Sequence, residues 1–291
     1  MCNNFILYFN FLKMLFLIIM KTIRKILVNG KIETLYGKNF SYSDNEGKKI
    51  NDTSIKFLFP VKPRLIVCVH LNYKSRLDEL KRIQPQAPTY FWKPASCLNF
   101  HKENVVRPLG CKYLNYEGEI ALVVGRKAKN IKYEEANKYI MGYSIANDFG
   151  LHDFRDTDEN SMVRVKGTDT LGAVGPDIAL NWDYRNKNIT TYVNDKIVQK
   201  SNTSDMLWSP EYLLADLSKS ITFNKGDLIL TGTPANSRPV EPGSVVKVVV
   251  ENLGVLENKV VEGKSSLSRG VGAMPKDSDH IRSISLGSDN K

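Results

Sequence analysis

The sequence predicts a mixed α+β fold that is rich in strands. Short segments with apolar or alternating patterns recur between Gly, Asn and Pro turn signals, and only a few segments have helical periodicity. The chain has 291 residues, of which 42% are hydrophobic and 25% charged, values that are ordinary for a globular protein of one or two domains. These values exclude a collagen, a disordered tail and a disulfide miniprotein.

An apolar run over residues 5–20 opens the chain. It is shorter than the ~20 residues that span a bilayer, and the cations Lys21 and Arg24 follow it, whereas a secretory signal carries its cations in front. We expect Met20 to be the true start and residues 1–19 to derive from a misassigned upstream start codon, with no membrane involved. The alternative is an anchor with its N-terminus outside.

Charge and cysteine content narrow the range of partners. Lys and Arg number 41 against 31 Asp and Glu, but the cations are scattered and no zinc-finger or RNP-like motif occurs. We therefore expect a solvated basic surface and no nucleic acid. The four cysteines form no CxxC pair, which predicts reduced thiols in a cytoplasmic protein and neither disulfides nor a thiolate metal site.

Residues 20–59 are predicted to form a small N-terminal β module. The segment TIRKILVNGKIETLY alternates around an Asn-Gly turn at residues 29–30, and further turn signals follow between residues 44 and 47. A buried apolar strand over residues 65–69 then begins the second and larger domain, which we place at 60–262.

The first half of this domain contains two predicted strands and a helix. Residues 113–125 alternate and then become fully apolar, which indicates a strand that runs into the core. A helix is predicted over residues 132–141, with Gly142 as its C-terminal cap. The strand YSIAND follows at 143–148.

The second half begins with a helix-start signal. Ser209 is a predicted N-cap and Pro210 the first residue of a helix. A strand at 228–232 and a β-hairpin over 244–262 complete the domain. Residues 263–291 are polar and predict a loosely held C-terminal tail.

Three acids are candidate metal ligands. Glu117 and Glu119 stand two apart in a predicted strand, so their side chains point from one face, and Asp148 closes a neighbouring strand. Carboxylates that face the same way repel unless a cation or a proton lies between them. Converging oxygens suit Mg²⁺ or Mn²⁺. The spacing alone is more typical of a solvated strand face, and the metal site stays open as the alternative at this point.

Ordered motifs around these acids resemble those of the fumarylacetoacetate hydrolase family. They are NYEGEIALVVG at 115–125, GYSIAND at 142–148, a K-x-x-D…GP segment at 166–176 and LTGTP at 230–234, with VCVHLNYKSR and YFWKPAS upstream. The resemblance covers 60–262. It implies a β-roll catalytic domain, usually a homodimer, that binds one Mg²⁺ or Mn²⁺.

The resemblance also implies roles for single residues. It assigns three acids as metal ligands: Glu117, Glu119 and Asp148. Lys166 matches the lysine that contacts the substrate or the developing enolate. Thr233 matches the threonine whose segment binds the substrate carboxylate, and we assign Gly232 and Tyr73 to substrate binding with it.

The chain departs from the family pattern at two places. Family hydrolases commonly carry a histidine four residues after the Asn of the NY motif, which activates water with a glutamate; here that position is Arg76, while Glu79 remains. His70 lies nearby, but a histidine in a strand is more often packed than a base. Where many members have an arginine after the metal aspartate, this chain has His152, with Arg155 one helical turn on, and either could meet an anionic substrate.

The implied chemistry is that of a 2-oxo acid or its enol, whose enolate is stabilised by the ion. Isomerisation, decarboxylation and carbon–carbon hydrolysis are three exits from this enolate. Because Arg76 replaces the water-activating histidine, we expect an isomerase or decarboxylase of a dienoic diacid in aromatic catabolism, similar to 2-hydroxyhepta-2,4-diene-1,7-dioate isomerase. Arg76 would then hold the far carboxylate of the diacid.

Two alternatives remain. One is a carbon–carbon hydrolase of the fumarylpyruvate, acylpyruvate or fumarylacetoacetate type, in which Glu79 directs water without a histidine. The other is a non-catalytic protein that binds a metal and a 2-oxo acid on the same fold. The side chain of the substrate does not follow from fold resemblance, because function depends on the site.

Overall fold

The computed structural model describes residues 20–28, 30–43, 55–266 and 270–287. The predicted leader and the turn signals between residues 44 and 47 lie outside these ranges. Within them, no helix has the length and apolar composition needed to cross a membrane.

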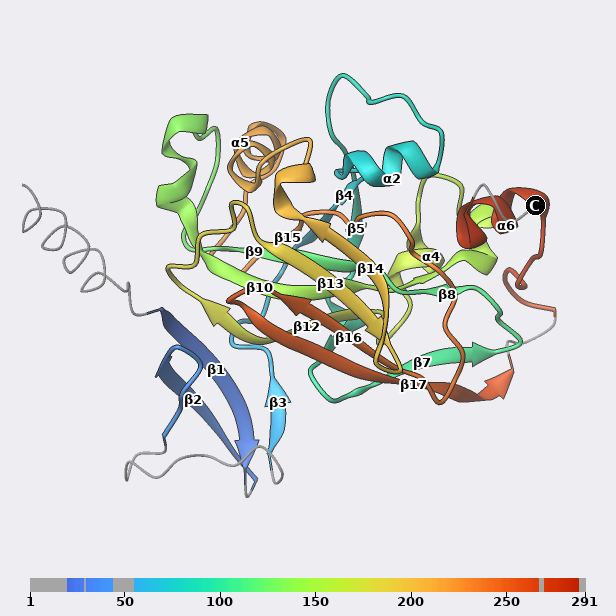
Figure 1. Ribbon diagram of the computed structural model, residues 1–291, viewed down its shortest axis with the longest axis horizontal. Coiled ribbons are helices and arrows are strands. Elements are labelled where there is room, and N and C mark those ends of the chain that lie inside the picture. Colours follow the sequence, from blue (N-terminus) through green and yellow to red (C-terminus); the bar gives the residue numbers. More distant parts are fainter. Residues whose placement is uncertain (1–19, 29, 44–54, 267–269, 288–291) are drawn as a thin grey trace, which may run out of the picture.

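Two sheets form the framework, and the predicted mixed α+β, strand-rich fold is confirmed (Figure 1). The strands of the main sheet are β1 (Lys21–Val28), β2 (Lys31–Lys38), β3 (Lys56–Leu58), β4 (Ile66–His70), β5 (Thr89–Lys93), β6 (Leu98–Phe100), β9 (Gly118–Val124), β10 (Ile140–Asp148), β12 (Gly172–Ala179) and β15 (Leu228–Leu230). Their order is β2-β1-β12-β10-β9-β15-β4-β5, with β3 beside β1 and β6 beside β12. The second sheet has the order β14-β13-β16-β17-β7. Its strands are β7 (Asn104–Leu109), β13 (Asn188–Val193), β14 (Lys196–Asn202), β16 (Val245–Val250) and β17 (Gly254–Ser266).

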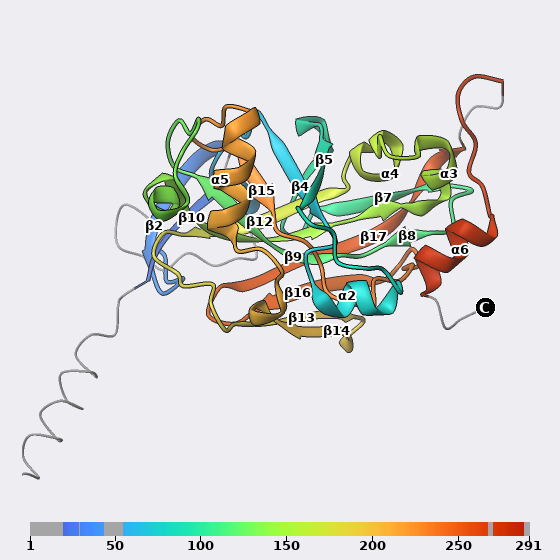
Figure 2. The ribbon, with the colours of Figure 1, turned by 90° about the horizontal axis from the view of Figure 1, so that it is seen from above.

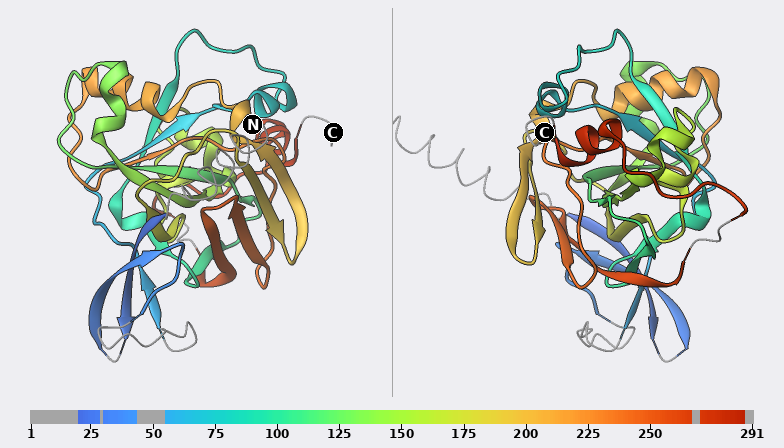
Figure 3. Two further views of the ribbon diagram at one scale, coloured as in Figure 1. Left: turned by 60° about the vertical axis from the view of Figure 1, so that its left-hand side comes forward. Right: turned by 90° about the vertical axis from the view of Figure 1, so that its right-hand side faces the viewer.

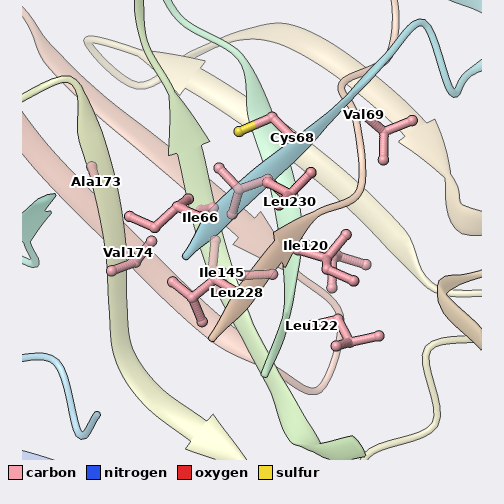
Figure 4. Packing of buried hydrophobic residues seen from close by; sticks show 14 of the residues in the cluster. Ile66, Cys68, Val69, Ile120, Leu122, Ile145, Ala173, Val174, Leu228 and Leu230 are labelled. Atoms are coloured by element: carbon pink, nitrogen blue, oxygen red, sulfur yellow. The ribbon is translucent and has the colours of Figure 1, made fainter. Parts of the chain in front are cut away.

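The two sheets share one hydrophobic core. Figure 2 shows β13, β14 and β16 as a layer beside β9, and the buried cluster joins Ile120 and Ile145 of the main sheet to Val248 of the second. Figure 4 shows the packing inside the main sheet, where β4 and β15 bring their aliphatic side chains to those of β9 and β10. Strand β9 is buried along its whole length, as its continuous apolar run predicts. Along strand β16, buried side chains instead alternate with partly exposed ones.

Short helices and a two-stranded ladder connect these strands. The α-helices are α2 (Lys74–Glu79), α3 (Arg155–Asp158), α4 (Val163–Gly167), α5 (Pro210–Ser220) and α6 (Asp279–Leu286). The 3₁₀ turns are η2 (Ala95–Cys97), η3 (Tyr133–Tyr139), η4 (His152–Phe154) and η5 (Thr203–Asp205), and the ladder pairs β8 (Leu114–Asn115) with β11 (Gly150–Leu151). The predicted start of α5 is confirmed, because the Ser209 hydroxyl accepts a hydrogen bond from the amide of Tyr212.

The connection between β9 and β10 differs from the prediction. It contains the 3₁₀ turn η3, and Gly142 lies inside β10 rather than at the end of a helix. A Cβ atom at Gly142 would lie 2.2 Å from the carbonyl oxygen of Ala179 in β12, so glycine permits the close approach of these backbones. The prediction of a helix cap was wrong because a glycine after an apolar run has the same pattern in both situations.

The C-terminal segment is more ordered than predicted. Strand β17 continues to Ser266, and α6 packs against the domain beside α3 and η4 (Figure 3). Ile281 is fully buried, and the Asn115 side chain donates a hydrogen bond to the carbonyl of Ser285. The expectation of a loosely held tail was therefore wrong for residues 279–286. Although the segment is mostly polar, it forms a short helix whose Ile281 is buried against the domain.

The predicted N-terminal hairpin of β1 and β2 is confirmed, and it extends the main sheet. Strand β1 pairs with β12, with Thr22 opposite Ala179. The Arg24 guanidinium binds both carboxylate oxygens of Asp177, at 2.8 and 3.0 Å, and the Tyr42 hydroxyl donates to the same carboxylate at 3.0 Å. Because Asp177 is buried, this ion pair anchors the hairpin to the domain.

We predict that Arg24→Leu lowers the free energy of unfolding by about 3 kcal/mol, because it removes the cation from a buried carboxylate. Urea denaturation monitored by circular dichroism measures the change. Arg185→Leu is the matched control, since Arg185 pairs with Asp183 at the surface and should leave the midpoint nearly unchanged. Equal midpoints for the two variants would contradict the anchoring role.

Candidate metal centre and active site

Three buried carboxylates converge at one end of β9 and β10. Glu119 lies in β9, Asp148 ends β10, and Glu117 comes just before β9. Each offers an oxygen, and these oxygens all lie within 4.8 Å of one another. The antiparallel register of β9 and β10, with Ala146 opposite Glu119, brings the acids together. The sequence thus located the cluster correctly, and its burial argues against the solvated strand face.

Backbone and amide groups fix these carboxylates. The predicted strand over residues 113–125 is interrupted before Gly118, and the Asn147 side chain accepts a hydrogen bond from the Glu117 amide at 2.8 Å. The Gly232 amide donates to Glu119 Oε2 at 2.7 Å. Glycine is required at 232, since φ is +93° and a Cβ would lie 2.8 Å from Asn72 Cβ. The Gly232 amide therefore orients the Glu119 carboxylate.

Two buried lysines lie against the cluster. Lys166 Nζ is 2.7 Å from Glu117 Oε2 and 3.0 Å from Asp148 Oδ2, and it donates to the Asp148 carbonyl. Lys93 Nζ binds Asp148 Oδ1 at 2.6 Å. Sequence reasoning named Lys166 but missed Lys93, whose only signal was its place in the YFWKPAS motif.

The charges leave one carboxylate without a counter-charge. Burial and the charges of Asp148 and Glu117 raise the pKa of Glu119 well above its usual value. Burial acts in the same direction on Glu117, but Lys166 prevails and lowers the pKa of that carboxyl. Asp148 Oδ2 is buried and, apart from its ion pair with Lys166, has no hydrogen-bond partner among the described residues. Three hard oxygen donors with an unbalanced negative charge therefore fit a divalent cation such as Mg²⁺ or Mn²⁺.

A cavity of about 950 Å³ opens over Glu117 and Glu119. Of the predicted site residues, four more line it: Arg76, Arg155, Lys166 and Thr233. Thr233 Oγ1 accepts a hydrogen bond from Gln199 at 3.1 Å. Apolar groups such as Phe91 and Ile83 share the wall, and α6 contributes Ser283 and Ile284 at the outer rim. The site can thus hold a molecule with an anionic end and an apolar or polar extension.

Glu79 is held away from this cavity. It pairs with Arg76 and, at 2.6 Å, with Arg238, and it accepts a hydrogen bond from the Asn236 amide. Burial opposes ionisation, but the two arginines prevail and lower the pKa of Glu79. The described residues that line the cavity do not include Glu79. A carboxylate paired in this way is a poor base for water.

His152 and Tyr73 lie behind the cavity wall, contrary to the expectation that they contact substrate. Both are fully buried, and neither is among the described lining residues. His152 Nδ1 is 3.0 Å from Ser285 Oγ, and its Nε2 is 3.2 Å from Arg155 Nη2 and 3.8 Å from Glu117 Oε1. Burial and Arg155 lower the pKa of His152, so the ring is neutral. It therefore supports Arg155 and Glu117 from the rear.

His70 is a cavity residue that the sequence analysis did not assign to the site. It was expected to be packed in the strand, but it ends β4 and lines the cavity. A strand residue reaches a cavity when the strand ends at its edge, and the sequence alone does not show where that edge lies.

Comparison with known sequences gives the following matches. The family profile for "Fumarylacetoacetate (FAA) hydrolase C-terminal" matches residues 65–261. An uncharacterized protein of Methanocaldococcus jannaschii is 40% identical over 200 residues, which is 69% of this chain and 84% of that protein. The bifunctional isomerase/decarboxylase of 4-hydroxyphenylacetate degradation from Escherichia coli is 33% identical over 215 residues, 72% of this chain and 50% of that protein.

Solved structures share the fold. The 5-carboxymethyl-2-hydroxymuconate delta-isomerase of Mycobacterium smegmatis superposes with a TM-score of 0.74 at 28% identity, covering 84% of this chain and 100% of that one. A maleylpyruvate hydrolase from Sphingobium, in complex with manganese(II) and pyruvate, has a TM-score of 0.65 at 27% identity, with 74% of this chain and 77% of that one covered.

Proposed function

The chain belongs to the fumarylacetoacetate hydrolase family, and from this premise we propose that it is a divalent-metal-dependent enzyme acting on a 2-oxo acid or its enol. The observation that carries the proposal is the buried cluster of Glu117, Glu119 and Asp148 beneath a cavity lined by cations. These three carboxylates would hold Mg²⁺ or Mn²⁺, and the ion would supply Lewis acidity toward an enolate oxygen. The proposal includes a homodimer, as the family resemblance implies, and a location in the cytoplasm, as the unpaired cysteines suggest.

Lys166 is suited to stabilise developing negative charge. Its ammonium group lies on the cavity wall, against Glu117 and Asp148 and 5.7 Å from the centre of the Phe91 ring. Charge on a substrate oxygen beside the carboxylates would gain a donor that is already oriented, so little reorganisation accompanies the reaction. Phe91 keeps water away from this part of the wall.

Arg155 is the better candidate for a second carboxylate of the substrate. We expected Arg76 to play this part, but Arg76 is paired with Glu79. Arg155 lines the cavity, makes no ion pair with any described acid, and has a buried Nε without a hydrogen-bond partner. Burial lowers its pKa only to about 10, so it stays cationic at neutral pH. An unpaired guanidinium in a cavity favours a carboxylate.

These features favour isomerisation or decarboxylation of a diacid, as in aromatic catabolism. Glu79 is paired with two arginines and does not line the cavity, so a water-activating group is not apparent among the predicted residues. A carbon–carbon hydrolase is the second candidate, supported by the likeness to the maleylpyruvate hydrolase.

The test is turnover of a panel of 2-oxo and 2-hydroxydienoic diacids, followed by ultraviolet absorbance and product mass. We predict turnover that requires Mg²⁺ or Mn²⁺ and falls at least about 10²-fold in Glu119→Gln, which lacks a charged oxygen donor. Asp195→Asn is the control, because that acid is exposed in the turn between β13 and β14, pairs with Lys247 and does not line the cavity.

The product identifies the exit from the enolate. Unchanged mass indicates an isomerase, loss of CO₂ a decarboxylase and gain of water a hydrolase. Metal binding without turnover of any panel member would contradict the proposed enzyme and support the non-catalytic binding protein.

We further predict that Arg155→Met raises KM for a diacid about 10–100-fold, because one charged hydrogen-bond partner is lost. KM for a matched 2-oxo monoacid should change less than about 2-fold. Steady-state kinetics on both substrates measures the difference, and Arg76→Met is the comparison variant. A diacid-specific loss in Arg76→Met and none in Arg155→Met would reverse the assignment.

A further inference from the structure

Resting on the proposed function, we propose that the imidazole of His70 is the acid–base group that moves the proton at the carbon next to the ketone of the 2-oxo acid. The chain has Arg76 where a histidine would be expected, and Glu79 is held by two arginines, so the proton needs another carrier. His70 reaches the same cavity from a different strand.

The position of His70 follows from the order of the strands. Strand β4 lies between β15 and β5 in the main sheet, and Cys68 and His70 share one of its faces because side chains alternate. Cys68 pairs with Phe91 across the β4–β5 ladder, so this is the face that also carries Lys93, which binds Asp148 of the charge cluster. Two residues on, His70 ends the strand on that face and enters the cavity wall that also contains Lys166.

The Phe91 ring connects His70 to the reactive end of the cavity. Its centre lies 5.8 Å from the centre of the His70 ring, in an edge-to-face arrangement, and 5.7 Å from Lys166 Nζ. Because His70, Phe91 and Lys166 also line the same cavity, one substrate in that cavity can approach both the imidazole and the ammonium group. The substrate's oxygen would then lie toward Lys166 and its carbon chain toward His70.

His70 is also chemically available. The structure shows no hydrogen bond or ion pair from its ring to any described residue, whereas the other cavity-lining histidine, His280, is 2.8 Å from Asp156. The hydroxyl of Tyr90, which also lines the cavity, is already engaged as the donor of a hydrogen bond to Asp216. Burial and the charge of Arg155 lower the pKa of His70 to about 4, so at neutral pH the ring is uncharged and a nitrogen lone pair can accept a proton.

The step balances within the substrate and this side chain. The ring nitrogen takes the proton from the carbon next to the ketone, the C–H electron pair becomes the carbon–carbon double bond of the enolate, and the carbonyl pair moves onto oxygen. The resulting imidazolium returns the proton to the same carbon, or to the far end of a conjugated chain, which is an isomerisation. Neither an oxidant nor a further reactant is needed.

The experiment compares His70→Gln with His101→Gln, a control at a histidine that does not line the cavity and instead contacts Phe57 and the Glu257 amide. With Mg²⁺ and a 2-oxo diacid that the wild type turns over, we expect His70→Gln to lower kcat about 10²–10⁴-fold with KM changed less than about 3-fold. Proton–deuterium exchange at the carbon next to the ketone, followed by NMR in D₂O, should fall in parallel. His101→Gln should keep both rates.

Chemical rescue separates proton transfer from a structural role. Added imidazole should restore turnover in His70→Gly and leave Lys166→Ala inactive. Full kcat and full exchange in His70→Gln would overturn the proposal; if that variant does not fold, His70→Asn and the rescue decide in the same way. If the wild type itself shows no Mg²⁺-dependent turnover, the proposed function fails. If only the His70 variants behave like the wild type, the role of His70 fails, so the two outcomes are distinguishable.

Discussion

Placing oxygens of three carboxylates within 4.8 Å of one another in a buried site is the constraint on which the rest of the structure depends. Glu117, Glu119 and Asp148 repel each other in a medium that screens charge poorly. Lys93 and Lys166 compensate two of the three charges, and Glu119 keeps a raised pKa. A divalent cation would neutralise the remaining charge, which supports the proposed metal centre.

The fold supplies this arrangement through contacts that are remote in sequence. The register of β9 and β10 sets two acids side by side, and the Gly232 amide orients Glu119 from the strand end of β15. Helix α6 closes the rear, where Ser285 contacts His152, which lies against Arg155. Carboxylates beneath a cavity lined by cations suit the anionic substrate that we propose. In the proposed mechanism, His70 on the same cavity wall takes the part of the histidine that Arg76 replaces.

Local sequence patterns predicted the features that depend on neighbouring residues, such as strands and helix starts. They did not predict the features that depend on contacts between residues far apart in the sequence. Strand alternation and ordered motifs placed the three acids, and helix-start chemistry placed Ser209. Lys93 and Asp148 are 55 residues apart in the sequence, so no local pattern predicts that they pair. Likewise, Gly142 serves a contact with β12, and His70 is exposed to the cavity only because β4 ends at its edge.

Calorimetric titration of Mn²⁺ into the metal-free protein tests the central claim most directly, because it asks whether the carboxylate cluster binds a cation before any question of substrate. The account predicts one ion per chain in the wild type and in Asp195→Asn, and affinity weakened by at least about 10-fold in Glu119→Gln, where a charged ligand is lost. Equal affinity in Glu119→Gln, or no binding by the wild type, would contradict the account.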